Sequence, residues 1–182
     1  MITCRAAVRQ SWTVGLAATA LAAVAAWPAA AARMDRSLMA DPVGYCRAVG
    51  TIDAPDQRYL GPAVPDWMAG ALRRATGAPA TAPREPFRQA VWRCDEGEVL
   101  ACAVGANLPC GEKAVVSRTP PEGAVAFCRG QPGAAVVPAF AVDHANVFEW
   151  RCDGDAPVIV RQVAEVDRRG FVAGIWYRVG KE

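Results

Sequence analysis

The chain has 182 residues, 53% of them hydrophobic, and its 20 lysines and arginines against 18 aspartates and glutamates give a formal net charge of +2. This length suits one domain with a modest core. Because a nearly neutral chain lacks the basic surplus that phosphate backbones require, the composition argues against nucleic acid as a partner.

The first 32 residues have the pattern of a secretory signal peptide. Arg5 and Arg9 precede an apolar run from Val14 to Trp27, and the small residues Ala30–Ala32 follow it. The apolar run is shorter than the roughly 20 residues that span a bilayer. We therefore predict a cleaved signal peptide over residues 1–32, no stable membrane anchor, and a periplasmic or secreted mature protein. The competing interpretation is a retained anchor.

Cleavage at this position changes both the charge and the cysteine count. Arg5, Arg9 and Cys4 leave with the signal peptide, so 18 basic and 18 acidic residues remain and the formal charge becomes 18 − 18 = 0. Six cysteines in an exported chain of this size predict three disulfides. These cysteines are Cys46, Cys94, Cys102, Cys110, Cys128 and Cys152.

The first half of the mature chain begins with an irregular segment. Residues 33–65 are rich in proline, aspartate and glycine, with one short helix expected within 41–50. An apolar stripe predicts a helix over Trp67–Thr76, with Asp66 as its N-terminal cap and Gly77 after its end. A proline-rich loop follows. Two strands are then predicted over residues 87–94 and 98–105, joined by an Asp-Glu-Gly turn.

The second half predicts one helix followed by strands. Thr119 is expected to cap a helix that ends with Gly130. Short apolar runs then predict strands over 135–142, 146–152, 157–166 and 171–179. The expected fold is a single mature α+β domain over residues 33–182, with a mainly antiparallel sheet of about five to six short strands and two to three short helices on one face.

The sequence Trp-Arg-Cys-Asp occurs twice, at Trp92–Asp95 and at Trp150–Asp153. An aromatic-Cys-Arg sequence precedes each copy, at Tyr45–Arg47 and at Phe127–Arg129. We interpret this as an internal pseudo-repeat, in which a helix carrying aromatic-Cys-Arg precedes a strand carrying Trp-Arg-Cys-Asp. The spacing differs between the copies, so the helix predicted after Asp66 would be an insertion in the first.

The pseudo-repeat predicts how the cysteines pair. If the copies pack alike, Cys46 bonds to Cys94 and Cys128 to Cys152, so that each disulfide ties a helix to the strand it covers. Cys102 and Cys110 would then close a small loop. The competing arrangement joins Cys94 to Cys152, because fifteen pairings exist for six cysteines.

The repeated sequence admits a functional and a structural interpretation. As a site, Trp92 and Trp150 would form the walls of a ligand pocket, with Arg93 and Arg151 as anion ligands. As scaffold, period-two alternation sends tryptophan and cysteine inward and arginine and aspartate outward. The structural interpretation is favoured, because it requires no chemistry from these residues.

His144 is the only histidine, so it is the sole candidate for a general base near neutral pH. The mature chain has two serines, Ser37 and Ser117, and neither lies in a nucleophile-elbow sequence. We therefore assign no catalytic residue. The alternative is a small secreted hydrolase in which Glu149, Asp143 or Asp95 acts with His144, as pairs of carboxylates do in acid–base hydrolysis.

No metal or cofactor is predicted, because the cysteines lie too far apart in sequence for a zinc site and the haem attachment sequence is absent. The function expected is that of an exported, non-enzymatic binding protein, with an unidentified protein or small-molecule partner in the cell envelope. The candidate functional surface is the loop closed by Cys102 and Cys110, the turn carrying His144, and the aromatic pair near the C-terminus. Its named residues are Asn107, Asp143, His144, Trp176 and Tyr177.

Overall fold

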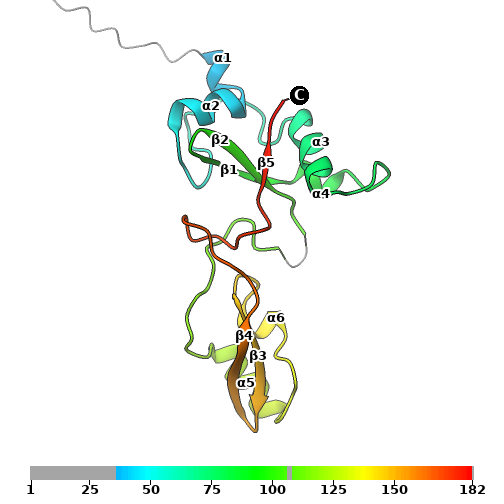
Figure 1. Ribbon diagram of the computed structural model, residues 1–182, viewed down its shortest axis with the longest axis vertical. Coiled ribbons are helices and arrows are strands. Elements are labelled where there is room, and N and C mark those ends of the chain that lie inside the picture. Colours follow the sequence, from blue (N-terminus) through cyan, green and yellow to red (C-terminus); the bar gives the residue numbers. More distant parts are fainter. Residues whose placement is uncertain (1–35, 106–107, 182) are drawn as a thin grey trace, which may run out of the picture. The chain divides into compact units, whose positions relative to one another are not determined.

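The computed structural model describes residues 36–105 and 108–181, so the predicted signal peptide and Asn107 lie outside the described residues. Its elements are six helical segments and five strands (Figure 1). The helices are α1 (Arg36–Met39), α2 (Pro42–Val49), α3 (Asp66–Ala75), α4 (Glu85–Arg88), α5 (Glu122–Gly130) and α6 (Ala139–Val142). The strands are β1 (Val91–Asp95), β2 (Glu98–Cys102), β3 (Phe148–Asp153), β4 (Ala156–Gln162) and β5 (Tyr177–Val179).

Three strands form one antiparallel sheet in the order β1-β2-β5. Asp95 pairs with Glu98, so the β1–β2 hairpin has a two-residue turn at Glu96 and Gly97, whose φ angles of 51° and 83° are both positive. A turn of this kind matches the twist of the flanking strands, and glycine adopts its second position without strain. The third strand, β5, comes from the far end of the chain and pairs through Val99 and Val179.

Helices α2 and α3 both contact this sheet, α2 through β1 and β2 and α3 through β2 and β5. Their buried side chains and the inward residues of the strands make the first hydrophobic core. It includes Met39, Tyr45, Met68, Leu72, Phe87, Trp92, Val99 and Val179. Tyr45, Tyr59 and Trp92 pack edge to face within it, with ring centroids 4.9 to 5.9 Å apart.

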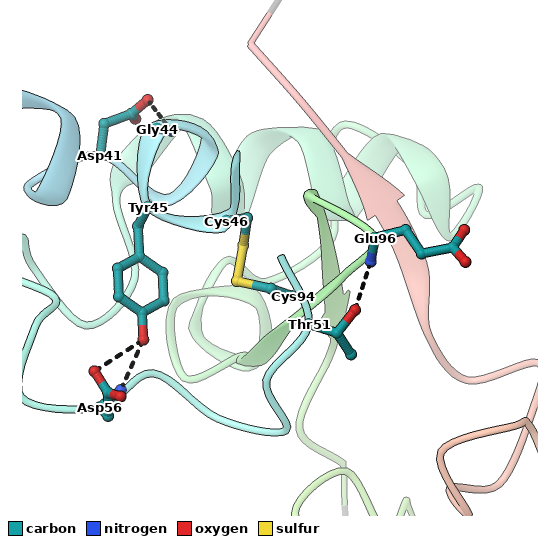
Figure 2. Close-up of a disulfide and its surroundings, with 8 residues drawn as sticks. All are labelled: Asp41, Gly44, Tyr45, Cys46, Thr51, Asp56, Cys94 and Glu96. Atoms are coloured by element: carbon teal, nitrogen blue, oxygen red, sulfur yellow. Dashed lines mark hydrogen bonds between the residues drawn. A yellow bond between two sulfur atoms is a disulfide. The ribbon is translucent and has the colours of Figure 1, made fainter. Parts of the chain in front are cut away.

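A disulfide and hydrogen bonds fix α2 in this core (Figure 2). Cys46, on α2, is bonded to Cys94, on β1, and both are buried. Asp41 caps α2 by accepting a hydrogen bond from the backbone N–H of Gly44 at 3.3 Å. The Tyr45 hydroxyl, from the middle of the helix, donates to Asp56 at 3.1 Å. Side chains therefore secure the N-terminus and the middle of this short helix.

The second hydrophobic core is built from the chain between residues 114 and 175, with α5, α6 and the β3–β4 hairpin. Cys128 on α5 is bonded to Cys152 on β3. The Val137 N–H donates to the Trp150 carbonyl and the Cys152 N–H to the Ala134 carbonyl, both at 2.8 Å, so an irregular segment covers the edge of β3. The buried members include Ala124, Val142, Val147, Phe148, Trp150 and Val172.

All three predicted disulfides are present, with Cys102 bonded to Cys110 in addition to the two helix–strand bonds. The α+β class and the antiparallel pairing are confirmed as well. The competing Cys94–Cys152 pairing is excluded, because these cysteines take part in different disulfides.

Other details of the predicted fold are wrong. The described strands form two sheets instead of one, and helical segments outnumber the two to three expected. Residues 135–142 were expected as a strand, but Pro138 lacks the N–H that a strand needs and precedes α6 instead. Phe87 likewise lies in α4, and β1 begins only at Val91. The N-terminal cap of α3 is Pro65 and not Asp66, and that of α5 is Pro121 and not Thr119.

Candidate functional site

The two copies of Trp-Arg-Cys-Asp differ at arginine. Tryptophan and cysteine are buried in both, with Trp92 3% and Trp150 1% exposed, so neither indole forms the wall of an accessible pocket. Arg151 is exposed, as alternation predicts, and lies 3.5 Å from Asp153. Arg93, by contrast, is only 2% exposed and is the one buried charged side chain among the described residues. The prediction that Arg93 faces solvent is therefore wrong.

Arg93 is buried because another segment covers its face of β1. Its guanidinium carbon lies 4.4 Å from the ring centroid of Phe171 and 4.5 Å from that of Trp176, within the range of cation–π attraction. Its Nη2 donates to the carboxylate of Asp167. Alternation does hold along β1, but the face opposite Trp92 meets aromatic rings instead of water.

Asp167 organises the turn that contacts Arg93. Its Oδ1 accepts the backbone N–H groups of Arg169 at 2.8 Å and Phe171 at 3.0 Å, leaving Oδ2 for Arg93. Burial would raise the pKa of Asp167, but the hydrogen bonds from the Phe171 backbone and from Arg93 outweigh it, so this pKa is lowered. The carboxylate is thus held ionised opposite a permanent cation.

Neighbouring ion pairs extend this contact. Arg169 donates to Asp53 at 2.8 and 2.9 Å, and Lys113 donates to the same carboxylate at 2.7 Å. Arg168 binds Asp95 at 2.7 Å and also pairs with Glu96. Each cation of the Asp167–Phe171 turn therefore has an acidic partner, so this cluster is neutralised internally and offers no free charge to a ligand.

The candidate functional site lies instead where two predicted surface segments meet. Leu108 and Pro109, from the loop closed by the Cys102–Cys110 disulfide, line one pocket together with His144 and the α6 helix. This pocket, here called the His144 pocket, has a volume of about 450 Å³. Its lining residues are Leu108, Pro109, Glu112, Ala139, Phe140, Asp143 and His144.

Local backbone geometry presents these side chains. Pro138 is the N-terminal cap of the four-residue helix α6. Phe140 lies in this helix and is 80% exposed. Asp143 ends the helix with φ = 86°, and its carboxylate accepts the backbone N–H of Ala145 at 2.8 Å. A positive φ is uncommon for a residue with a side chain, and the bond from the Asp143 carboxylate to the backbone two residues on helps to hold this conformation. His144 follows on the exposed turn.

The pocket combines apolar and acidic chemistry. Phe140 is the most exposed of the large hydrophobic side chains that the structure describes, and Leu108 is 44% exposed. Asp143 and Glu112 add two negative charges, and no described cation pairs with either of them. An exposed aromatic beside unpaired carboxylates matches a surface that presents both an apolar side chain and a positive charge.

The remaining residues of the predicted surface have other surroundings. Trp176 packs its ring against the guanidinium of Arg93 and meets the ring of Phe171 edge to face, with the ring centroids 5.3 Å apart. Its Nε1 is buried without a hydrogen-bond acceptor. Tyr177 lies in β5 and packs against the first core. This aromatic pair therefore contributes to packing, and the structure does not bring it into the His144 pocket.

The three carboxylates considered for a hydrolase do not come together in one pocket, because two of them bind arginines elsewhere. Glu149 accepts a hydrogen bond from Arg161 at 2.6 Å, and Asp95 is engaged by Arg168. Of the three, only Asp143 lines the pocket with His144, and Glu112 joins it there. Sequence reasoning missed Glu112 and Phe140. The proline before α6 was a signal that could have revealed Phe140 as a helix residue.

No group of three or more histidine, cysteine, aspartate or glutamate side chains within the described part of the chain could hold a metal ion. None of its helices is long and apolar enough to cross a membrane. Comparison with known protein families, curated proteins and solved structures finds no match for this chain.

Proposed function

We propose that this chain is an exported, disulfide-stabilised binding protein whose His144 pocket contacts a cationic protein in the cell envelope. Three disulfides are typical of proteins that fold in an oxidising compartment. The observation that carries the proposal is the convergence of the Cys102–Cys110 loop and the α6 turn, two segments far apart in sequence, around the exposed ring of Phe140.

The chemistry of the pocket indicates the partner class. Phe140 supplies an aromatic anchor of the kind that dominates protein interfaces, and Glu112 and Asp143 favour a positively charged partner. Wall-degrading muramidases of the lysozyme type are cationic proteins that act in the envelope. We therefore infer an inhibitor or sequestering protein for such an enzyme. The two Trp-Arg-Cys-Asp hairpins, proposed as copies of one ancestral unit, would be the scaffold.

The test uses a c-type lysozyme as probe, with cytochrome c as a control protein of similar size and positive charge. We expect the oxidised chain to bind lysozyme with a dissociation constant of about 1 µM or below, and cytochrome c at least tenfold more weakly. Phe140→Ala should weaken lysozyme binding at least tenfold. Glu112→Gln combined with Asp143→Asn should weaken it and flatten its salt dependence.

The matched control variants are Val160→Ala, an exposed apolar residue on β4, and Asp155→Asn, an exposed acidic residue of the β3–β4 turn. Both should bind lysozyme like the unaltered chain. The proposal is wrong if lysozyme does not bind, or if Phe140→Ala binds as tightly as Val160→Ala.

A second candidate, a hydrolase using His144, rests on one observation: Asp143 and Glu112 line the same pocket as His144. General acid–base hydrolysis needs such convergent groups. A peptidoglycan-clearing assay of the chain without lysozyme separates the candidates. The binding protein leaves the suspension turbid, whereas clearing that His144→Ala abolishes would establish the hydrolase.

A further inference from the structure

A second cavity lies between α3 and α4, and it shares no residue with the His144 pocket. Its volume is about 290 Å³, near the lower end of the range for small-molecule sites. The lining residues are Asp66, Ala69, Gly70, Arg73, Arg84, Phe87 and Arg88. Three of these seven are arginines, which makes this a cavity of mixed apolar and cationic character.

The apolar part of the lining is fixed by the first core. Phe87 is 8% exposed and Ala69 is 9% exposed, and both belong to that core. Gly70 completes this wall in the middle of α3. A hydrophobic surface of this size can cover the carbon skeleton of a small ligand but not a large one.

Gly70 has no structural requirement to be glycine. A Cβ placed there would meet only Nη1 of Arg74, at an ordinary contact distance of 3.6 Å. Glycine inside a helix nevertheless makes the helix less stable than almost any other residue would, with proline as the exception. Because Gly70 has no side chain, the cavity wall is open at this position. Keeping the cavity open is therefore a reason for glycine here, whereas the packing around Gly70 gives none.

The three arginines differ in how they are held. Arg73 is anchored, because its Nη1 donates to the backbone carbonyls of Pro79 at 3.4 Å and Ala80 at 2.6 Å. Arg88 lies 3.5 Å from Asp66 in an exposed pair, which is a weak interaction. The backbone carbonyl of Arg84 accepts the N–H groups of Phe87 and Arg88, both at 3.1 Å, but its guanidinium has no hydrogen-bond or ion-pair partner among the described residues. Against three cations stands one carboxylate, so the cavity carries two uncompensated positive charges.

We propose that this cavity binds a small organic carboxylate. The carboxylate is held by Arg84 and Arg88, whose planar guanidinium groups can each donate two parallel hydrogen bonds to it. The apolar body of the ligand lies against Phe87 and the clear wall at Gly70. A bare inorganic anion would satisfy the arginines but leave that apolar surface unused.

Binding is measured by NMR titration of the oxidised chain at low salt, with benzoate as the probe. Benzyl alcohol has the same ring without the charge, and inorganic phosphate has the charge without the ring. Benzoate is expected to bind at least tenfold more tightly than either. Equal affinity for benzoate and benzyl alcohol, or for benzoate and phosphate, would overturn the proposal.

Variants then locate the site. Arg84→Gln and Arg88→Gln should each weaken benzoate binding at least fivefold, and Gly70→Leu should weaken it by narrowing the cavity while leaving α3 folded, because leucine favours helix. Arg129→Gln removes an exposed arginine from the last turn of α5 and should change nothing. If Arg84→Gln binds benzoate like Arg129→Gln, the cavity is not the site.

Discussion

Arg93 and Asp167 lie 74 residues apart in sequence, and theirs is the one ion pair in the described part of the chain whose cation is buried. Truncating Arg93 removes this ion pair and leaves an unfilled space beside Phe171 and Trp176, at a cost of about 2–5 kcal/mol. We therefore expect Arg93→Ala to lower the free energy of unfolding by roughly this amount, measured by urea denaturation followed by tryptophan fluorescence.

Arg151→Ala is the matched control, because it removes the equivalent arginine of the other Trp-Arg-Cys-Asp copy from an exposed position. Its effect should stay within about 0.5 kcal/mol. Arg93→Met should cost less than Arg93→Ala, since methionine fills the space between Phe171 and Trp176 without the two buried nitrogens, Nε and Nη1, that lack acceptors. Equal effects of Arg93→Ala and Arg151→Ala would contradict this account.

The disulfides should differ in their contribution to stability. Their sequence separations are 48, 24 and 8 residues, and loop-closure entropy gives contributions of about 4, 3.5 and 2.5 kcal/mol in that order. Replacing both cysteines of a pair with alanine should therefore be most harmful for Cys46–Cys94 and least harmful for Cys102–Cys110. Chemical denaturation of the three double variants checks the ranking, which a larger loss for Cys102–Cys110 would contradict.

Acid should destabilise the protein through its hydrogen-bonded carboxylates. The side chain and backbone of Arg58 lower the pKa of Asp56 to about 2. Because the folded pKa lies below the unfolded one, the stabilisation is complete above pH 4 and disappears as the pH falls towards about 2. We expect the protein with Asp56→Asn to lose less stability than the unaltered chain between pH 4 and about pH 2. The measurement is the thermal unfolding temperature of both proteins at each pH. Asp155→Asn, on an exposed turn, should leave the slope unchanged.

Two helix glycines should respond in opposite directions to alanine. A Cβ at Gly123 in α5 would lie 2.5 Å from the carbonyl oxygen of Ala141 in α6, so Gly123→Ala must push the helices apart, at about 1–3 kcal/mol. Gly70→Ala has room and should raise the free energy of unfolding by about 1 kcal/mol. Because α6 carries Phe140, Gly123→Ala should also weaken lysozyme binding. Similar stability changes for the two variants would contradict the close approach of α5 and α6.

The disulfide pairing could be predicted because it depends on local sequence similarity. The aromatic-Cys-Arg and Trp-Arg-Cys-Asp sequences mark which helix belongs to which strand, and the third pair follows by exclusion. The convergence of the Cys102–Cys110 loop and the His144 turn could not be predicted. Both were candidate surfaces, but nothing in either segment encodes its distance from the other.

The burial of Arg93 could not be predicted for a related reason. Alternation along β1 separates Arg93 from Trp92, and that much is correct. Whether the second face meets water depends on Asp167, Phe171 and Trp176, which approach from a segment more than 70 residues away. Identical four-residue sequences therefore have different environments, because tertiary contacts and not local patterns determine what covers a strand.

The pairing of β5 with β2 has a consequence for the order of folding. Val179 lies opposite Val99, so the sheet that supports the first core is incomplete until the chain has emerged as far as residue 179. Non-local pairing of this kind slows folding, because the two ends of a long loop must meet, at a cost in chain entropy, before the contact forms. A nascent chain that has emerged only as far as β2 would expose the apolar side of a two-stranded hairpin. If the chain is exported as proposed, this incomplete sheet would help to keep it unfolded enough to be threaded across a membrane.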